Sequence, residues 1–249
     1  MAKRIIIPAR LHSTRLPGKV LIKIAGKPML EHVYERAVAC EFDSVVIATD
    51  DEQVAQAARD FGAPVCMTSA AHTSGTDRLA EAVKILGYDD QDVIVNLQGD
   101  EPLMPIENIH QVATMLATHK EAAVATLRHT IESIRDALDP NLVKVVADKA
   151  GYALYFSRAP IPWHRGIFPD KTPEQLEMFY HVGMYAYRGD FLQHYQELTP
   201  CQLEKIEGLE QLRVLYHGFK IIVKEAKANT PPGVDTEVGL AKVRKLLGD

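Results

Sequence analysis

The sequence predicts an α/β protein in which a mixed, mostly parallel sheet is flanked by helices. Up to His119, short apolar runs rich in β-branched residues alternate with segments whose apolar residues recur at helical spacing. This alternation is typical of a parallel sheet that helices cover on both faces. The composition agrees, because 47% of the 249 residues are hydrophobic and 24% are charged, as in ordinary globular proteins.

The first half of the chain contains four expected strands and four expected helices in strict alternation. The first strand is the isoleucine run 5–7, which is expected to end at Pro8. The other strands are expected at residues 44–49, 64–68 and 93–97. The helices, which show one apolar face each, are expected at residues 28–39, 52–61, 76–86 and 105–119.

The pattern changes after residue 120, where strands follow one another with little helix between them. Strands are expected at residues 122–127, 142–147, 152–156 and 220–223. Residues 178–188 alternate, which places Tyr180, Val182, Met184 and Ala186 on one face and His181, Gly183, Tyr185 and Tyr187 on the other. Helices are expected at residues 202–216 and after the loop 230–235, where Thr236 is a candidate cap and Leu240, Val243 and Leu247 would point inward.

The loop after the first strand carries an unusual concentration of positive charge. Seven Lys and Arg residues precede Glu31, the first acidic residue, although the whole chain has a net charge of −5. Arg10 and Arg15 offer planar forks and Lys19 offers a point charge, as a nucleoside triphosphate requires. The spacing does not fit a Walker P-loop, since Gly18 and Lys19 are followed by Val20. The alternative is a solvated basic loop without a ligand.

Two aspartates are candidate ligands for a divalent cation. Asp100 follows the buried strand at residues 93–97, and a carboxylate at such a strand end can hold Mg²⁺ against a phosphate. Asp235 follows Gly233 in the loop before the last helix. Each has a structural alternative as a helix N-cap, Asp100 for the helix near Pro105 and Asp235 for the last helix.

Two further groups of polar residues could contact a substrate. In the segment HTSGTDR, Ser74 and Gly75 precede a helix whose free backbone donors could read a nucleobase edge, although such residues are usually only caps. In the second half, one set of residues could bind a polyhydroxylated carboxylate: Arg158, His181, Tyr185, Glu210 and Gln211. The alternative for these residues is an ordinary role in packing or at the surface.

Several functional classes are disfavoured. The acidic balance argues against a protein that coats nucleic acid, and neither a signal peptide nor a membrane span is expected. The three cysteines are odd in number and far apart, which suggests neither a disulfide framework nor a zinc site, and Cys66 is expected to be a buried small hydrophobic residue. These observations predict a cytosolic protein.

Several motifs together resemble the cytidylyltransferase family, and most closely its members that act on the acidic sugar 3-deoxy-manno-octulosonate (Kdo). The motifs run from the first strand to the last helix: PARLHSTRLPGK, GKPML, ATDDE, HTSGTDRLAE, VNLQGDEP, GYALYFSRAPIPW, HVGMYAYR, LEQLRVLYHG and PGVDT. The resemblance implies a nucleotide-diphospho-sugar transferase-like fold with a smaller dimerising insertion, and a homodimer in the cytoplasm. The implied reaction converts CTP and Kdo to CMP-Kdo and pyrophosphate, with Mg²⁺, for lipopolysaccharide synthesis.

The resemblance also implies a role for each candidate residue. Arg10, Arg15, Lys19 and Asp100 would be catalytic. The nucleotide would be bound by Pro8, Ala9, Arg10, Arg15, Lys19, Thr68, Ser74, Gly75, Arg78 and Asp100. The sugar would be bound by Gln98, Arg158, His181, Tyr185, Glu210 and Gln211, and Mg²⁺ by Asp100 and Asp235. The chain would form a single α/β domain over residues 1–249, with a nucleotide-binding half at about 1–120 and a sugar-binding and dimerising part at about 121–220.

This sequence departs from the family pattern at two places. Residues 237–239 are Glu-Val-Gly, where the family pattern is more acidic, which puts the details of the last helix in doubt. Glu101 stands in QGDEP, where relatives that use an 8-amino sugar are expected to carry Gln, and this favours plain Kdo.

Two other functions compete with this interpretation. One is a nucleotidyltransferase that acts on a sugar 1-phosphate or on another acidic sugar, which the second half of the chain should distinguish. The other is a catalytically inactive nucleotide-binding regulator on the same fold, against which the joint presence of Lys19, Asp100 and Asp235 argues.

Overall fold

The structure is a computed structural model that describes residues 1–13, 15–72, 74–166, 168, 177–231 and 233–249. Thr14, Thr73 and Pro232, which belong to three of the loops considered above, lie outside the described residues.

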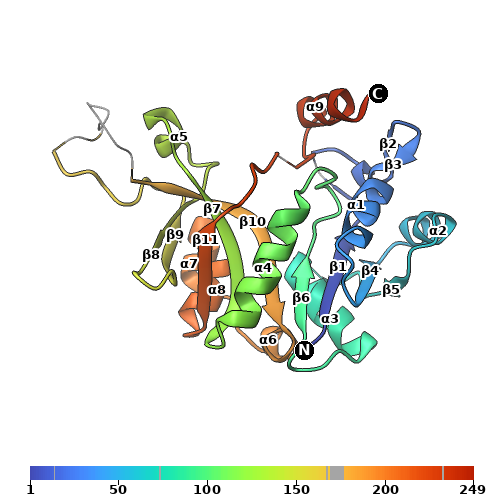
Figure 1. Cartoon of the computed structure of the whole chain (residues 1–249), viewed down its shortest axis with the longest axis horizontal. Coiled ribbons are helices and arrows are strands. Elements are labelled where there is room, and N and C mark those ends of the chain that lie inside the picture. Colours follow the sequence, from blue (N-terminus) through green and yellow to red (C-terminus); the bar gives the residue numbers. More distant parts are fainter. Residues whose placement is uncertain (14, 73, 167, 169–176, 232) are drawn as a thin grey trace.

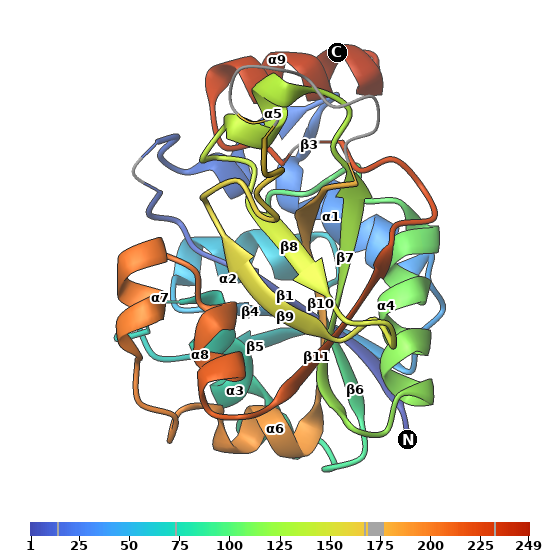
Figure 2. The same cartoon turned by 90° about the vertical axis from the view of Figure 1, so that its left-hand side faces the viewer.

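A mixed and mostly parallel sheet forms the centre of the molecule, as predicted. Its main path, over the described residues, has the strand order β11-β7-β10-β6-β1-β4-β5 (Figure 1). These strands are β1 (Lys3–Ala9), β4 (Ser44–Thr49), β5 (Val65–Met67), β6 (Val93–Asn96), β7 (Ala122–Thr130), β10 (Phe179–Arg188) and β11 (Lys220–Glu225). Only β10 runs antiparallel to its neighbours β6 and β7 within this path. An antiparallel pair, β8 (Lys144–Ala147) and β9 (Ala153–Ser157), extends the sheet beside β10 (Figure 2).

Helices cover both faces of the sheet, which confirms the layered architecture. Ile5 and Ile7 of β1 face one core with α1 (Met29–Val38), α2 (Glu52–Asp60) and α4 (Ile106–Thr118). Ile6 faces the other core with α3 (Gly75–Leu86), α6 (Gly189–Tyr195) and α8 (Gln211–Tyr216). The isoleucine run is therefore apolar throughout because each successive side chain enters a different buried layer.

The alternation predicted for β10 is confirmed, although the strand contains an irregularity. Val182, Met184 and Ala186 lie in the first core, whereas Tyr187 lies in the second with Tyr185 packed against it. Between Val182 and Tyr185 the strand advances three residues while β7 advances one, so β10 contains two extra residues. Two extra residues keep the side chains beyond them on the same faces, since the side-chain period of a strand is two.

The prediction that the first strand ends at Pro8 is wrong, because β1 continues to Ala9. Pro8 pairs in register with Ala48 of β4, and its carbonyl accepts a hydrogen bond from the Gly99 amide at 3.3 Å. The ladder with β6 ends at the pair formed by Ile6 and Asn96. The missing N–H of Pro8 therefore faces the side where the strand ladder has already ended, so the proline costs no ladder hydrogen bond.

The prediction of one helix over residues 202–216 is also wrong. The structure has two short helices there, α7 (Gln202–Glu207) and α8, separated by a turn. Gly208 adopts φ +62° and caps α7, a left-handed conformation that glycine accepts without steric cost. The short elements α5 (Ile134–Leu138), α6, η1 (Lys19–Leu21), β2 (Lys23–Ile24) and β3 (Lys27–Pro28) were not predicted, because so few residues show no clear period.

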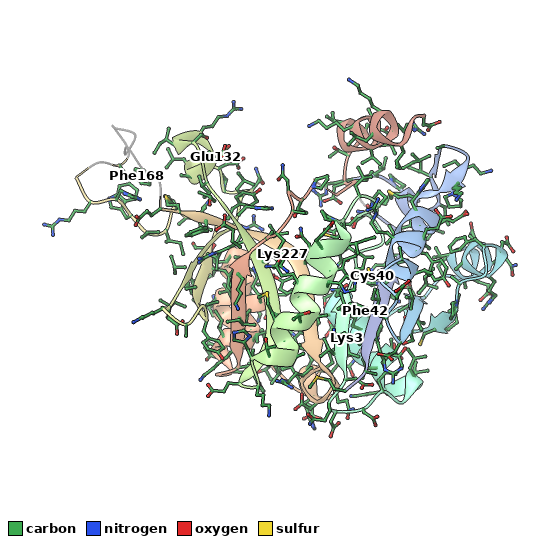
Figure 3. All side chains as sticks on the ribbon, in the orientation of Figure 1. Lys3, Cys40, Phe42, Glu132, Phe168 and Lys227 are labelled. Atoms are coloured by element: carbon green, nitrogen blue, oxygen red, sulfur yellow. The ribbon has the colours of Figure 1, made fainter. Side chains whose placement is uncertain are left out.

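The last helix and the cysteines agree with the predictions. Helix α9 (Glu237–Leu247) is capped by the Thr236 hydroxyl, which accepts a hydrogen bond from the Gly239 amide at 3.2 Å, and it buries Leu240 and Val243. All three cysteines are free and buried, Cys66 among them. Figure 3 shows Cys40 near Phe42 and Lys3, at the end of α1, and burial raises the pKa of the Cys40 thiol to about 11. None of the described helices combines the length and the apolar character that crossing a membrane would demand.

Candidate active site

Lys19, Asp100 and Asp235 meet at one point, although they come from three distant parts of the chain. The Lys19 ammonium contacts Asp100 Oδ2 and donates a hydrogen bond to Asp235 Oδ1 at 2.6 Å. Asp100 does not cap the helix that follows it, since Pro105 occupies the N-cap position of α4. Asp235 does not cap α9, whose cap is Thr236. The local alternatives for both aspartates are therefore excluded, because neither carboxylate caps a helix.

Backbone contacts hold the three loops together. The Val234 amide donates a hydrogen bond to the Asp100 carbonyl at 2.8 Å, which joins the C-terminal loop to the loop after β6. The loop after β6 also lies directly on β1, because a side chain at Gly99 would meet the Pro8 carbonyl oxygen at 3.1 Å. Glycine is the residue that permits this approach.

The electrostatics of the cluster favour a cation between the two aspartates. Burial alone would lower the pKa of Lys19, but the neighbouring Asp100 and Asp235 outweigh this effect and raise it. Burial opposes ionisation of Asp235, yet the hydrogen bond and charge of Lys19, together with Arg15, lower its pKa. Glu101 differs, because burial and the adjacent Asp100 raise the pKa of its carboxyl to about 8.

The two arginines of the basic loop take different positions. Arg15 Nη2 donates a hydrogen bond to Asp235 Oδ2 at 2.9 Å from an exposed position. Arg10 lies near Arg78, and its charge contributes to lowering the pKa of Arg78 after burial, which is the main cause. Only Arg15 of the two is thus joined directly to the Lys19 cluster by a described ion pair.

The residues expected around the cytosine and ribose surround the start of α3. Ser74 caps this helix, and its hydroxyl accepts a hydrogen bond from the Asp77 amide at 3.1 Å, so the capping alternative holds for Ser74. Arg78 is fully buried, donates a hydrogen bond to the Thr68 hydroxyl at 2.5 Å, and lies 3.2 Å from Asp50 Oδ1. Arg78 therefore ties α3 to the ends of β4 and β5.

A cavity of about 350 Å³ lies beside the start of α3, between this helix, the sheet and the turn before α8. Five of the predicted residues line it: Gly75, Gln98, Tyr185, Glu210 and Gln211. Its other lining residues are Thr76, Asn96, Val124, Tyr187, Tyr195, Gly208, Leu209 and Val214. Amide, hydroxyl and carboxylate groups on an aromatic wall suit a ligand with many hydroxyl groups.

Four polar lining residues of this cavity were missed by the sequence reasoning. Asn96 ends the apolar run of β6 and Thr76 is the second residue of α3. Tyr187 and Tyr195 belong to an apolar layer. Thr76 donates a hydrogen bond to Glu210 Oε2 at 3.2 Å, so the two walls of the cavity are joined. Asn96 alone carried a usable signal, because an amide at the end of a buried strand requires a partner.

Two residues expected in the sugar site lie outside the lining of this cavity. Arg158 donates hydrogen bonds to the carbonyls of Glu207 at 2.6 Å and Pro140 at 3.0 Å, and thereby joins the end of α7 to the loop before β8. His181 lies behind Tyr185, with the ring centroids 5.3 Å apart. Both are thus neighbours of the cavity in this structure, and their contact with a sugar stays a prediction.

The environment of His181 keeps its imidazole neutral. Its Nε2 lies 2.9 Å from the Thr126 hydroxyl, which can donate its own hydrogen to the carbonyls of Val182 and Met184. This network assigns the proton of His181 to Nε2. Burial lowers the pKa of His181 to about 3.

We expect His181 to make the folded protein less stable in acid. Because its pKa of about 3 lies below the 6.5 of an unperturbed His, only the unfolded state gains this proton as the pH falls below 6.5. The free energy of unfolding should fall by up to about 1.4 kcal/mol per pH unit from this residue. Urea unfolding of wild type and His181→Gln at pH 5 and pH 7 checks this, since the variant should show the weaker pH dependence. The exposed His194→Gln should keep the wild-type pH dependence, and equal slopes for all three proteins would contradict the assignment.

The charged cluster, the residues around α3 and the cavity lie along the sheet ends that carry the loops after β1, β5 and β6.

A family model described as cytidylyltransferase matches residues 4–222. The chain is 55% identical over 243 residues to the 3-deoxy-manno-octulosonate cytidylyltransferase of Francisella tularensis subsp. holarctica (strain FTNF002-00 / FTA), covering 98% of this chain and 97% of that protein. It is 52% identical over 246 residues to the enzyme of the same name from Coxiella burnetii (strain Dugway 5J108-111), covering 98% and 99%.

A solved structure is similar over the same length. It is CMP:2-keto-3-deoxy-manno-octonic acid synthetase complexed with CTP, with a TM-score of 0.90 and 44% sequence identity. The match covers 100% of this chain and 99% of that chain. The likeness therefore extends over both halves of the chain.

Proposed function

Because this chain belongs to the cytidylyltransferase family, we propose that it transfers CMP from CTP to the anomeric hydroxyl of Kdo and releases pyrophosphate. The observation that carries the proposal is a single loop after β6. Gln98 of this loop lines the cavity, and Asp100, two residues later, contacts Lys19. A sugar in the cavity and a triphosphate at the basic loop would therefore be neighbours.

The residues present fit a divalent cation, for which we propose Mg²⁺. Asp100 and Asp235 bring carboxylates from two loops to one point. The Lys19 ammonium contacts both, so a positive charge is already stabilised at this point. The described residues hold no cluster of three or more His, Cys, Asp or Glu side chains, so the remaining ligands would be water and phosphate oxygens. A bound Mg²⁺ would lower the pKa of the attacking hydroxyl and neutralise phosphate charge.

The chain's own residues would orient the reactants for an in-line displacement at the α-phosphorus of CTP. Lys19, with Arg10 and Arg15, would stabilise the charge on the phosphate oxygens and on the leaving pyrophosphate. Gln98, Glu210 and Gln211 would orient the sugar through hydrogen bonds to its hydroxyl groups. The bond from the sugar oxygen to phosphorus forms as the bond to pyrophosphate breaks, and the proton of the hydroxyl is released to water.

A pyrophosphate-release assay with CTP, Mg²⁺ and Kdo tests the function. We expect turnover with Kdo and CTP, and far less when UTP replaces CTP or when sialic acid or a hexose 1-phosphate replaces Kdo. Turnover with a hexose 1-phosphate would indicate a different nucleotidyltransferase. Tight CTP binding without turnover on any acidic sugar would indicate a nucleotide-binding regulator.

The proposal includes a homodimer in the cytoplasm that serves lipopolysaccharide synthesis, and sedimentation of the pure protein tests the dimer.

Replacing Gln211 with Ala should weaken use of the sugar more than use of the nucleotide. Gln211 is a buried residue of the cavity wall, and loss of one hydrogen bond to an uncharged group should raise the KM for Kdo about 10-fold. The KM for CTP should change by less than about 2-fold, and initial rates at varied Kdo and CTP measure both. Gln202→Ala, an exposed residue at the start of α7, serves as the control. An equal rise in both KM values would mean that the sugar does not bind in this cavity.

A further inference from the structure

A buried ion pair joins the two helices that follow the cavity wall. Arg213 of α8 donates hydrogen bonds to both carboxylate oxygens of Glu204 of α7, through Nε at 2.8 Å and Nη2 at 2.5 Å. Each side chain is only 11% exposed. The hydrogen bond that Glu204 accepts is the main cause of the raised pKa of Arg213, so this guanidinium is charged at neutral pH. This bidentate geometry fixes the direction of both side chains as well as their distance.

The ion pair spans the turn that presents the cavity wall. Residues 208–211 lie between the two partners in the sequence, and all four line the cavity. Other side chains contact this turn, since Arg158 donates to the carbonyls of Glu207 and Gly208 and Thr76 donates to Glu210. None of these contacts joins α7 to α8, and no side chain caps α8. Two short helices have little intrinsic stability, so their relative orientation depends on contacts between them. The Glu204–Arg213 contact supplies such a constraint.

The same pair also contacts an aromatic residue of the cavity lining. The Arg213 guanidinium lies 5.1 Å from the ring centroid of Tyr195, a residue of α6 that also lines the cavity. Phe191 packs edge-on against Tyr195, at 5.8 Å between centroids. The pair therefore joins α6, α7 and α8, and six of the cavity-lining residues belong to these helices or to the turn between them: Tyr195, Gly208, Leu209, Glu210, Gln211 and Val214.

We propose that Glu204 and Arg213 form a positioning unit that holds residues 208–211 and Tyr195 in the geometry that binds the sugar. The inference rests on the proposed function, since it assigns the sugar to this cavity. Neither side chain lines the cavity, so both act through Glu210, Gln211 and Tyr195. The nucleotide end of the site, at Lys19 and Asp100, has no described contact with the pair.

Single and double replacements separate positioning from folding. Arg213→Met and Glu204→Met each leave one buried charge without its partner and should lower the Tm by roughly 5 to 15 °C. The double variant Glu204→Met/Arg213→Met leaves no such charge, and methionine is unbranched and adaptable, so the Tm should largely recover. If the pair positions the wall, the KM for Kdo should stay raised about 10-fold or more in the double variant. The kcat and the KM for CTP should stay within about 2-fold of wild type.

A matched pair on the surface serves as the control. Glu121 and Lys220 also form an ion pair, but both are exposed and neither lines the cavity. Glu121→Met/Lys220→Met should change neither the Tm nor either KM appreciably.

Each outcome decides the inference. A raised KM for Kdo with a recovered Tm in the double variant supports it. A double variant with wild-type KM for Kdo would overturn it, because the pair would then serve folding alone. Equal rises in the KM values for Kdo and CTP would also overturn it. An absence of turnover with Kdo in the wild-type enzyme would instead refute the proposed function, so the two failures are distinguishable.

Discussion

Replacing Asp100 with Ala is expected to lower the rate of pyrophosphate release by about 100-fold or more, which is the loss found when one electrostatic stabiliser of a transition state is removed. Asp100 is one of two carboxylates that meet around Lys19, and no other described residue takes its place in that cluster. The fold should survive, because Lys19 keeps its contact with Asp235 and Asp100 caps no helix. Initial rates with saturating CTP and Kdo, at several magnesium concentrations, measure the effect.

Asp60→Ala is the matched control, since Asp60 is an exposed aspartate at the end of α2. It should keep wild-type turnover. Near-normal turnover of Asp100→Ala at limiting magnesium would contradict the proposed role of Asp100 in holding the metal.

Replacing Lys19 with Met is expected to lower turnover by about 100- to 1000-fold. Methionine keeps an unbranched apolar stem in a position that is 14% exposed, but removes the ammonium between Asp100 and Asp235. Two neighbouring carboxylates then retain only Arg15 as a described counter-charge, and the triphosphate loses a cation. Single-turnover rates, together with CTP binding by calorimetry, separate loss of chemistry from loss of binding.

The exposed Lys23→Met is the control for a lost positive charge in the same part of the chain. It should retain wild-type rates. A Lys19→Met enzyme that binds CTP weakly but turns over normally at saturation would show that Lys19 contributes binding alone.

The sheet could be predicted in detail because its strands carry strong local signals. Ile5, Ile6 and Ile7 are buried on both faces, so the run is apolar without interruption. Pro8 misled the prediction because the consequence of its missing N–H depends on which neighbour it faces, and the sequence of one strand does not contain that information.

The meeting of Asp100 with Lys19 was predictable from topology, whereas the cavity was only partly so. Loops after parallel strands gather at one edge of the sheet, which brings β1 and β6 side chains together. The cavity wall depends instead on how α6, α7 and α8 pack. Gly208 was read as an interior residue of one long helix, and its left-handed conformation places Glu210 and Gln211 where a continuous helix would not.

Tyr195 and Thr76 illustrate what local patterns omit. Thr76 looks like an ordinary helical residue, and Tyr195 lies in a segment for which no helix was predicted. The packing of α6 against α3 brings both to the same cavity. Arg158 shows the converse, because a charged residue at a strand end suggested ligand binding, and its guanidinium is held by the carbonyls of Glu207 and Pro140.

The contact between Lys19 and Asp235 joins residues that are 216 positions apart. Synthesis begins at the amino terminus, so most of the sheet can form on the ribosome before Asp235 is available to contact Lys19. A chain that stops before residue 235 lacks the second carboxylate that contacts Lys19.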